Sequence, residues 1–352
     1  MRHDTGAVVG GPQRLFLIDL GRIAAVLAVI AIHTWSVLGS LPPGSRQWWV
    51  AAIPYSTSRW AVPLFVMISG GLLLRSTSAG SPSSFYRRRL ARVVPPAIFW
   101  VVAYLLFRAT FLHEALSLRS VSADLFLGTP FVHLYFLYII VGLYLVTPII
   151  HPFVATASRG RLVLASVGLL GVPVLESGLR ALLGVGGGGG VTGLSYWVPY
   201  LGYFVAGLAF TGLRLRRSTG FLVAAVVICA LAGQVFLVYL LSDASQSIGY
   251  ATGYFSIFTA TATVGIYVLV AQASPAQHRS GWLATTVATL GLATFGVYLA
   301  HEMLLHWFAR DFAIHVPGHL ATNRIPTYLM VVVTSFAVVL VARRVPLARR
   351  LV

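Results

Sequence analysis

The fold is decided by a long apolar stretch near the amino end, LFLIDLGRIAAVLAVIAIHTW (residues 15–35). As a helix it is long enough to cross the ~30 Å hydrocarbon core of a bilayer. It is also too long, and too clearly interrupted by Arg22, for a cleaved signal peptide. Arg22 and His33 are eleven residues apart, which is three helical turns plus about 20°, so both lie on one face about 16 Å apart. Because ionisable groups in a membrane helix usually face a polar pathway, we expect a retained span with different chemistry at two depths.

The composition of the chain is that of a membrane protein. Hydrophobic residues make up 58% and charged residues 9% of the sequence, with a mean hydropathy of +0.85, whereas soluble domains carry roughly 25% charged residues. Apolar runs recur along the chain without a gap long enough for a separate core. We therefore predict an all-α polytopic membrane protein with a cytoplasmic N-terminal tail (1–14), one transmembrane domain (15–342) and a cytoplasmic basic tail (343–352).

Ten stretches have membrane length, and their bounds are uncertain by a few residues. They are 15–38, 57–74, 93–112, 131–154, 162–179, 196–212, 219–241, 252–273, 283–308 and 325–342. The positive-inside rule places both termini in the cytoplasm, because most arginines then fall in inner segments. We expect a multi-pass protein of the bacterial plasma membrane.

The charged and special residues exclude several classes of function. The net charge is +17 and every basic residue apart from histidine is arginine, so lysine catalysis and a Walker-type phosphate loop are excluded. The arginines lie between apolar runs, and we expect no nucleic-acid partner. The single cysteine, Cys229, permits neither an internal disulfide nor a thiolate zinc site, and we expect no metal. The run Gly186–Gly190 has the composition of a flexible linker.

The first span carries two candidate catalytic residues, Arg22 and His33, and a supporting residue, Asp19. Asp19 and Arg22 are three residues apart and can pair on one helix face, although Arg22 can also be explained as an arginine that snorkels to the inner surface. His33 is too short to snorkel far. An imidazole is well suited to deprotonate a hydroxyl near neutral pH, and the alternative is a histidine that serves helix packing.

Two further groups of polar residues carry possible chemistry. Arg88, Arg89 and Arg92 lie in the first inner loop, where arginine forks suit the phosphates of a ligand or simply those of lipid headgroups. On the outer side, we expect the supporting side chains to be those of His133, Tyr298, His301 and Glu302. A carboxylate beside imidazoles can orient a base or relay a proton; alternatively these are interfacial aromatic and polar residues at helix ends.

Together these segments resemble the acyltransferase-3 family of integral membrane O-acyltransferases over essentially the whole chain. The resemblance is carried by Asp19-x-x-Arg22-x10-His33, Phe65-x-x-Ile68-Ser-Gly70, Arg89-x-x-Arg92 with Pro95-Pro96, His133-x-x-Phe136-Leu137 and Tyr298-x-x-His301. Tyr135 stands where many relatives carry tryptophan. No esterase-like (SGNH) domain follows the last predicted span, so we expect a stand-alone membrane domain.

The resemblance implies a ten-helix enzyme that moves an acyl group, usually acetyl, from cytoplasmic acyl-CoA to a hydroxyl. By that resemblance Arg22 and His33 are the essential pair, and Arg89 and Arg92, with Arg88, bind the acyl-CoA phosphates. The pantetheine arm would pass Arg22 to reach His33, with direct transfer and an acyl-His33 intermediate both open. We expect no bound cofactor, and a surface polysaccharide or lipid-linked sugar as the acceptor. A glycosylated metabolite such as a macrolide is the alternative acceptor, and a glycan transporter is the alternative from another class.

Overall fold

The computed structural model describes residues 16–75, 81–185, 192–242, 245–272, 281–311 and 324–352. Within these ranges the regular secondary structure consists of helices and contains no strand. The predicted N-terminal tail and the glycine run 186–190 lie outside the described residues. The predicted all-α class is therefore confirmed for the part of the chain that the structure covers.

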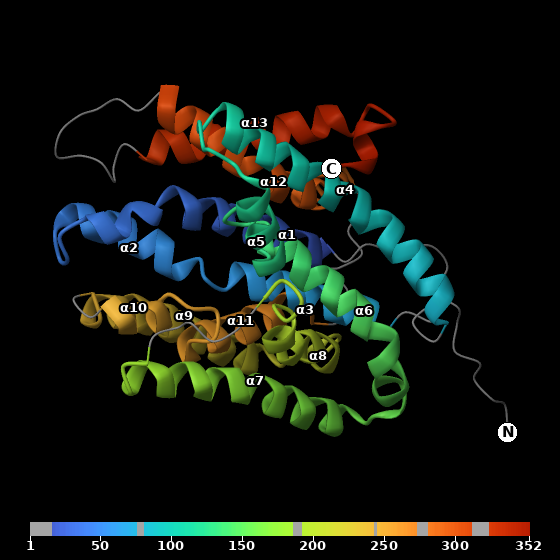
Figure 1. Cartoon of the computed structure of the whole chain (residues 1–352). Coiled ribbons are helices and arrows are strands. Elements are labelled where there is room, and N and C mark those ends of the chain that lie inside the picture. Colours follow the sequence, from blue (N-terminus) through green and yellow to red (C-terminus); the bar gives the residue numbers. More distant parts are fainter. Residues whose placement is uncertain (1–15, 76–80, 186–191, 243–244, 273–280, 312–323) are drawn as a thin grey trace, which may run out of the picture.

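The helices follow one another with short connections (Figure 1). In chain order they are α1 (Phe16–Thr34), α2 (Arg46–Thr57), α3 (Ala61–Leu73), α4 (Pro82–Thr110), α5 (Leu118–Leu127), α6 (Tyr135–Thr156), α7 (Arg159–Leu182), α8 (Leu201–Phe210), α9 (Arg217–Leu240), α10 (Ser245–Ala251), α11 (Ile257–Val270), α12 (Trp282–Asp311) and α13 (Arg324–Ala342). Three short 3-10 helices are also present among the described residues: η1 (Ser36–Ser40) follows α1, η3 (Val198–Tyr200) precedes α8, and η5 (Ala348–Arg350) follows α13.

Seven helices among the described residues are long and apolar enough to cross a membrane: α1 with η1, α4, α6, α7, α9, α12 and α13. Three of the ten predicted spans contain shorter helices instead. These are α3, α8 and α11, with 13, 10 and 14 residues. At 1.5 Å per residue none exceeds about 21 Å, which is less than the ~30 Å hydrocarbon core. The count of ten spans and the side of the termini stay predictions.

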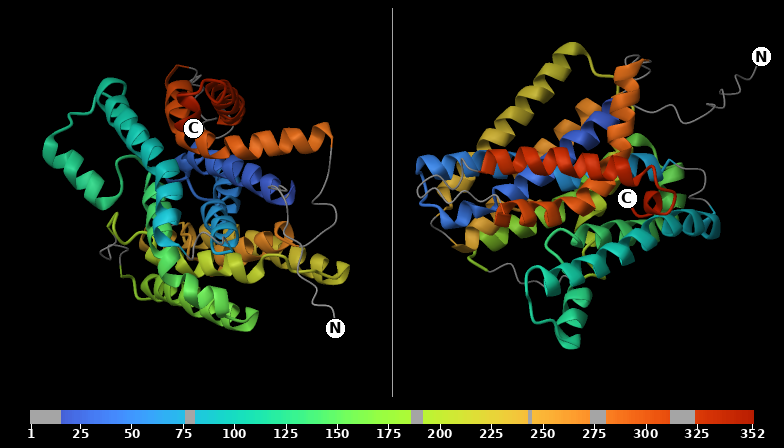
Figure 2. Two further views of the ribbon diagram at one scale, coloured as in Figure 1. Left: turned by 90° about the vertical axis from the view of Figure 1, so that its right-hand side faces the viewer. Right: turned by 90° about the horizontal axis from the view of Figure 1, so that it is seen from above.

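The first helix lies in the middle of the molecule. α1 packs against α12 and α13 on one side and against α3 on the other, and α3 in turn packs against α8. Figure 1 shows α12 and α13 at the top, α7, α8, α9 and α11 at the bottom, and α1 between them. α4 packs against α6 along one flank, and Figure 2 shows α4 and α5 standing out from the bundle. A central α1 places its three ionisable residues, Asp19, Arg22 and His33, within the helical bundle.

The α3–α8 crossing depends on two glycines. A Cβ built on Gly70 would collide with the main-chain oxygen of Phe204, and one on Gly207 would collide with that of Met67. Small residues let helix backbones approach closely in a membrane protein. The close contact of α3 with α8 therefore requires glycine at both positions.

The segment after α13 folds back onto the bundle. Trp100 Nε1 of α4 donates to the main-chain oxygen of Leu351 at 2.9 Å, and Arg343 donates to the main-chain oxygen of Leu292 in α12 at 2.8 Å. The C-terminus lies beside α4 in Figure 1. Residues 343–352, predicted as a basic tail, thus form part of the helical body.

Candidate active site

Helix α1 carries the pair that the sequence spacing predicts. Arg22 Nη1 lies 3.2 Å from Asp19 Oδ1, and Asp19 is buried. Gly291 of α12 provides the space for this aspartate, because a Cβ there would fall 2.8 Å from Asp19 Oδ1. The buried carboxylate holds the guanidinium in place and lowers the cost of keeping it within the bundle.

His33 has a carboxylate partner on α12. Its Nδ1 lies 2.5 Å from Glu302 Oε1, with the two side chains 15% and 3% exposed. The other carboxylate oxygen, Oε2, lies 3.2 Å from His306 Nδ1. An ionised carboxylate only accepts hydrogen bonds, so Nδ1 of His33 donates, and Nε2 is the nitrogen left to face a substrate. A base oriented by a carboxylate in this way is a common catalytic arrangement.

Three histidines from distant parts of the chain meet at this point. The ring centroid of His33 lies 6.2 Å from that of His133 and 5.3 Å from that of His301, and His133 and His301 are 5.0 Å apart. His133 and His301 are fully buried. The sequence places these three histidines on one side of the membrane, and the structure brings their rings into contact.

This histidine cluster (His33, His133 and His301) contains nitrogens without protein partners. His301 Nδ1 lies 2.6 Å from the main-chain oxygen of Tyr298, so it donates that hydrogen bond and leaves Nε2 as an acceptor. Among the described residues, His301 Nε2 and both ring nitrogens of His133 are buried without a hydrogen-bond partner. Buried polar groups are rarely left unpaired, so the cluster offers polar contacts to a substrate.

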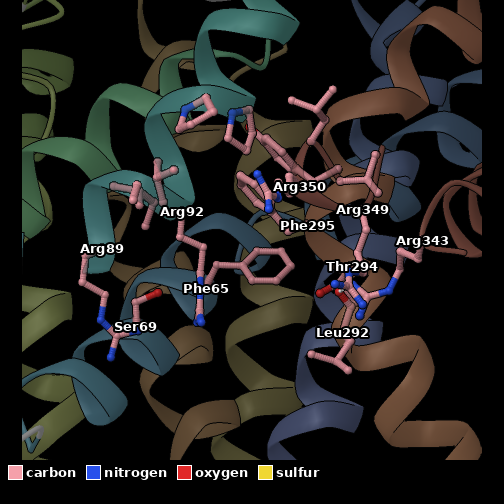
Figure 3. Close-up of a pocket in the computed structure, with 18 of the residues that line it drawn as sticks. Phe65, Ser69, Arg89, Arg92, Leu292, Thr294, Phe295, Arg343, Arg349 and Arg350 are labelled. Atoms are coloured by element: carbon pink, nitrogen blue, oxygen red, sulfur yellow. Dashed lines mark hydrogen bonds between the residues drawn. The ribbon is translucent and has the colours of Figure 1, made fainter. Parts of the chain in front are cut away.

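A large cavity lies on the other side of Tyr298. Its volume is about 1060 Å³, and α1, α3, α4, α6, α12 and the C-terminal segment contribute to its walls. Seven arginines line it: Arg22, Arg88, Arg89, Arg92, Arg343, Arg349 and Arg350. No described lining residue is acidic. Since guanidinium groups stay charged in proteins, a cavity with this lining attracts anions. Figure 3 shows Arg89 and Arg92 facing Arg343, Arg349 and Arg350 across it.

The cavity reaches Arg22 but not His33. Phe65, Phe136 and Tyr298 line it, and their rings touch in sequence with centroids 6.1 Å and 5.1 Å apart. The Tyr298 ring then contacts His133 at 5.4 Å and His301 at 5.8 Å, and its hydroxyl donates to the main-chain oxygen of His133. Tyr298 therefore belongs to both sites: its ring lines the cavity and contacts two histidines of the cluster.

The structure adds residues that the sequence did not single out. Arg343, Arg349 and Arg350 line the cavity, although their position after the last span predicted only a cytoplasmic basic tail. Ser69 and Tyr144 also belong to the lining. The high density of arginine after residue 342 could have indicated that this segment contributes to an anion-binding site. The positive-inside rule explains this density equally well, so these residues were not predicted to line the site.

The arrangement of the cluster also bears on metal binding. Ligand atoms of His33, His301 and Glu302 all lie within 4.8 Å of one another, and these are residue types that hold zinc or iron. However, the 2.5 Å contact between His33 and Glu302 is a direct hydrogen bond that leaves no room for an ion between those atoms. The imidazoles and the carboxylate of the cluster can transfer protons, and the arginine-lined cavity can bind an anionic ligand.

Comparison with known proteins identifies a family but no individual relative. No curated protein and no solved structure matches the chain. The sequence model of the acyltransferase-3 family, described as an acyltransferase domain, matches residues 16–344, nearly the whole chain. That range contains the Asp19–Arg22 pair, the histidine cluster and the arginines of α4. The chain belongs to the acyltransferase-3 family.

Proposed function

We propose that this protein is an O-acyltransferase of the bacterial plasma membrane that moves acetyl from cytoplasmic acetyl-CoA to a hydroxyl of a surface polysaccharide or lipid-linked sugar. The observation that carries the proposal is the hydrogen bond between His33 and Glu302 beside an arginine-lined cavity. The pair supplies a base, and the cavity supplies a place for an anionic donor. Family membership supports acyl transfer over transport.

The donor would lie in the cavity with its phosphates among the arginines. A volume of about 1060 Å³ is at the upper end of small-molecule sites, which suits a molecule as large as acyl-CoA. Arg88, Arg89 and Arg92 of α4 offer guanidinium forks that match phosphate oxygens. Arg22, fixed by Asp19, lies at the same cavity and would position the pantetheine arm.

The histidine cluster would perform the chemistry. His33 Nε2 takes the proton of the acceptor hydroxyl, whose oxygen attacks the thioester carbonyl carbon. The carbon–sulfur bond then breaks, and the CoA thiolate takes the proton back from His33 to leave as the thiol. Glu302 stabilises the imidazolium that forms in between. Attack of His33 itself on the thioester, followed by transfer from an acyl-histidine, uses the same groups.

Turnover of labelled acetyl-CoA in membranes tests this proposal. The wild-type protein should release free CoA thiol and transfer the label to an added polysaccharide or lipid-linked sugar, with a glycosylated macrolide as the comparison acceptor. His33→Ala, His33→Gln and Arg22→Ala should each abolish both signals at equal expression. His151→Gln is the matched control, because His151 of α6 lies outside the cluster and the cavity lining. Wild-type turnover in His33→Ala would exclude the mechanism.

A further inference from the structure

The arginines of the cavity form two separate groups. The α4 arginines are Arg88, Arg89 and Arg92, and the C-terminal arginines are Arg343, Arg349 and Arg350. Figure 3 shows Arg89 and Arg92 on one wall and the C-terminal arginines on the facing wall, with Phe65 and Phe295 between them. A ligand that touches both walls therefore needs two anionic centres that are separated in space.

The wall formed by the C-terminal segment is fixed to the bundle at three points. Trp100 of α4 donates to Leu351, and Arg343 donates to Leu292 of α12, at 2.9 Å and 2.8 Å. Val352 packs so close to Gly296 that a Cβ on this glycine would lie 2.9 Å from the Val352 Cβ. These contacts hold the turn that carries Arg349 and Arg350 in a fixed position at the cavity wall.

Arg349 and Arg350 are not paired with an acidic side chain in the described part of the chain. The described lining of the cavity contains no acidic side chain either. Adjacent guanidinium groups at one cavity repel each other, and an anion with several oxygens relieves this repulsion while accepting charge-assisted hydrogen bonds. A phosphate monoester has the charge and the number of oxygens that this pair requires.

Coenzyme A carries its phosphates at two places. The diphosphate is attached to the pantetheine arm, which has to point inward toward the thioester site, whereas the 3′-phosphate lies on the ribose at the far end. In the α4 group Arg89 is half-buried whereas Arg88 and Arg92 are exposed, and in the C-terminal group Arg343 is half-buried whereas Arg349 and Arg350 are exposed. Arg349 and Arg350 therefore lie on the outer part of their wall. We propose that Arg349 and Arg350 bind the 3′-phosphate of the acyl-CoA donor while the α4 arginines bind the diphosphate. The proposal rests on the function proposed above and adds the group by which the donor is recognised.

The test compares acetyl-CoA with acetyl-3′-dephospho-CoA, which lacks only that phosphate. The double variant Arg349→Gln/Arg350→Gln should raise the KM for acetyl-CoA by roughly tenfold or more, as loss of charge-assisted hydrogen bonds implies. Its KM for the dephospho donor should stay at the wild-type value. Arg89→Gln should raise the KM for both donors. Arg344→Gln is the matched control, because Arg344 is exposed in the same segment but does not line the cavity.

Turnover of the double variant with acetyl-3′-dephospho-CoA shows that it is folded. Competition in the wild-type protein needs no variant: adenosine 3′,5′-bisphosphate should inhibit more strongly than AMP. An equal KM change for both donors, no change for either, or equal inhibition by the two nucleotides would each overturn the proposal. Absence of acetyl transfer from either donor in the wild type is a different result, which overturns the proposed function itself.

Discussion

At the scale of single residues, one carboxylate is shared by two imidazoles. Glu302 uses Oε1 for His33 and Oε2 for His306, at 2.5 Å and 3.2 Å. A buried carboxylate needs such partners, because an unpaired charge in an apolar interior is costly. The contact with His306 fixes the carboxylate, so its other oxygen remains aimed at His33. The orientation of the proposed base therefore depends on α12 as much as on α1.

Glu302→Gln should lower kcat for acetyl transfer by roughly 100- to 10,000-fold and leave the KM for acetyl-CoA nearly unchanged. The amide cannot stabilise an imidazolium, and Glu302 does not line the donor cavity. Steady-state kinetics with acetyl-CoA measure both quantities. The control is His306→Gln, which keeps the contact to His33 and should lose less activity. A wild-type kcat in Glu302→Gln would show that the carboxylate only supports packing.

At the scale of helices, the short elements α3, α8 and α11 depend on their neighbours. In hydrocarbon, every backbone polar group needs a partner within the protein. Where α8 ends, Thr211 Oγ1 donates to the main-chain oxygen of Gly207 at 2.6 Å. Tyr267 OH of α11 donates to the same oxygen at 2.8 Å. At this end of α8, the main-chain oxygen of Gly207 thus finds partners in Thr211 and in Tyr267 of α11.

Gly70→Ala should destabilise the protein by about 1–3 kcal/mol, as overpacking of a tight contact does. The added methyl group meets the backbone of α8, which cannot move aside without shifting the helix. Thermal unfolding in detergent would measure the resulting fall in Tm. Gly168→Ala in α7 is the control, because a Cβ there meets nothing within 4 Å. Equal Tm values for the two variants would contradict the close α3–α8 crossing.

The contrast between these elements shows what the sequence can predict. Helical spacing predicted the contact of Asp19 with Arg22, because residues three or four apart share a helix face, and the same rule accounts for the contact of Glu302 with His306. The contact of His33 with Glu302 joins two distant helices, and no periodicity in a single sequence encodes which helices pack together. Apolar content alone also overestimated the length of α3, α8 and α11, because buried loops in a membrane protein can be as apolar as helices.

At the scale of the whole molecule, the two candidate sites are separated along α1. The arginine cavity lies at the Arg22 end and the histidine cluster at the His33 end. On the far part of α4, Arg108 bridges Glu114 and Asp124, with both N–O distances 2.7 Å. With the cytoplasmic termini that the arginine distribution predicts, the arginine cavity faces the cytoplasm and the Arg108 network faces outward.

Cysteine labelling of intact cells tests this orientation. In a Cys229→Ser background, Ser117→Cys beside α5 should react with a membrane-impermeant maleimide applied from outside. Arg344→Cys should react only after permeabilisation. Both residues are exposed, so lack of labelling in permeabilised cells would reveal misfolding. The opposite pattern would place the arginine cavity on the outer face and contradict a cytoplasmic donor.

The hydrogen bond from Trp100 to Leu351 has a practical consequence for handling the protein. A purification tag joined directly to Val352 would begin at the cavity wall, where Leu351 and Val352 are half-buried. Its bulk would press on the turn that presents Arg349 and Arg350. A cleavable tag joined through a long spacer avoids this artefact, and comparing donor affinity before and after its removal shows whether the attachment disturbs the enzyme.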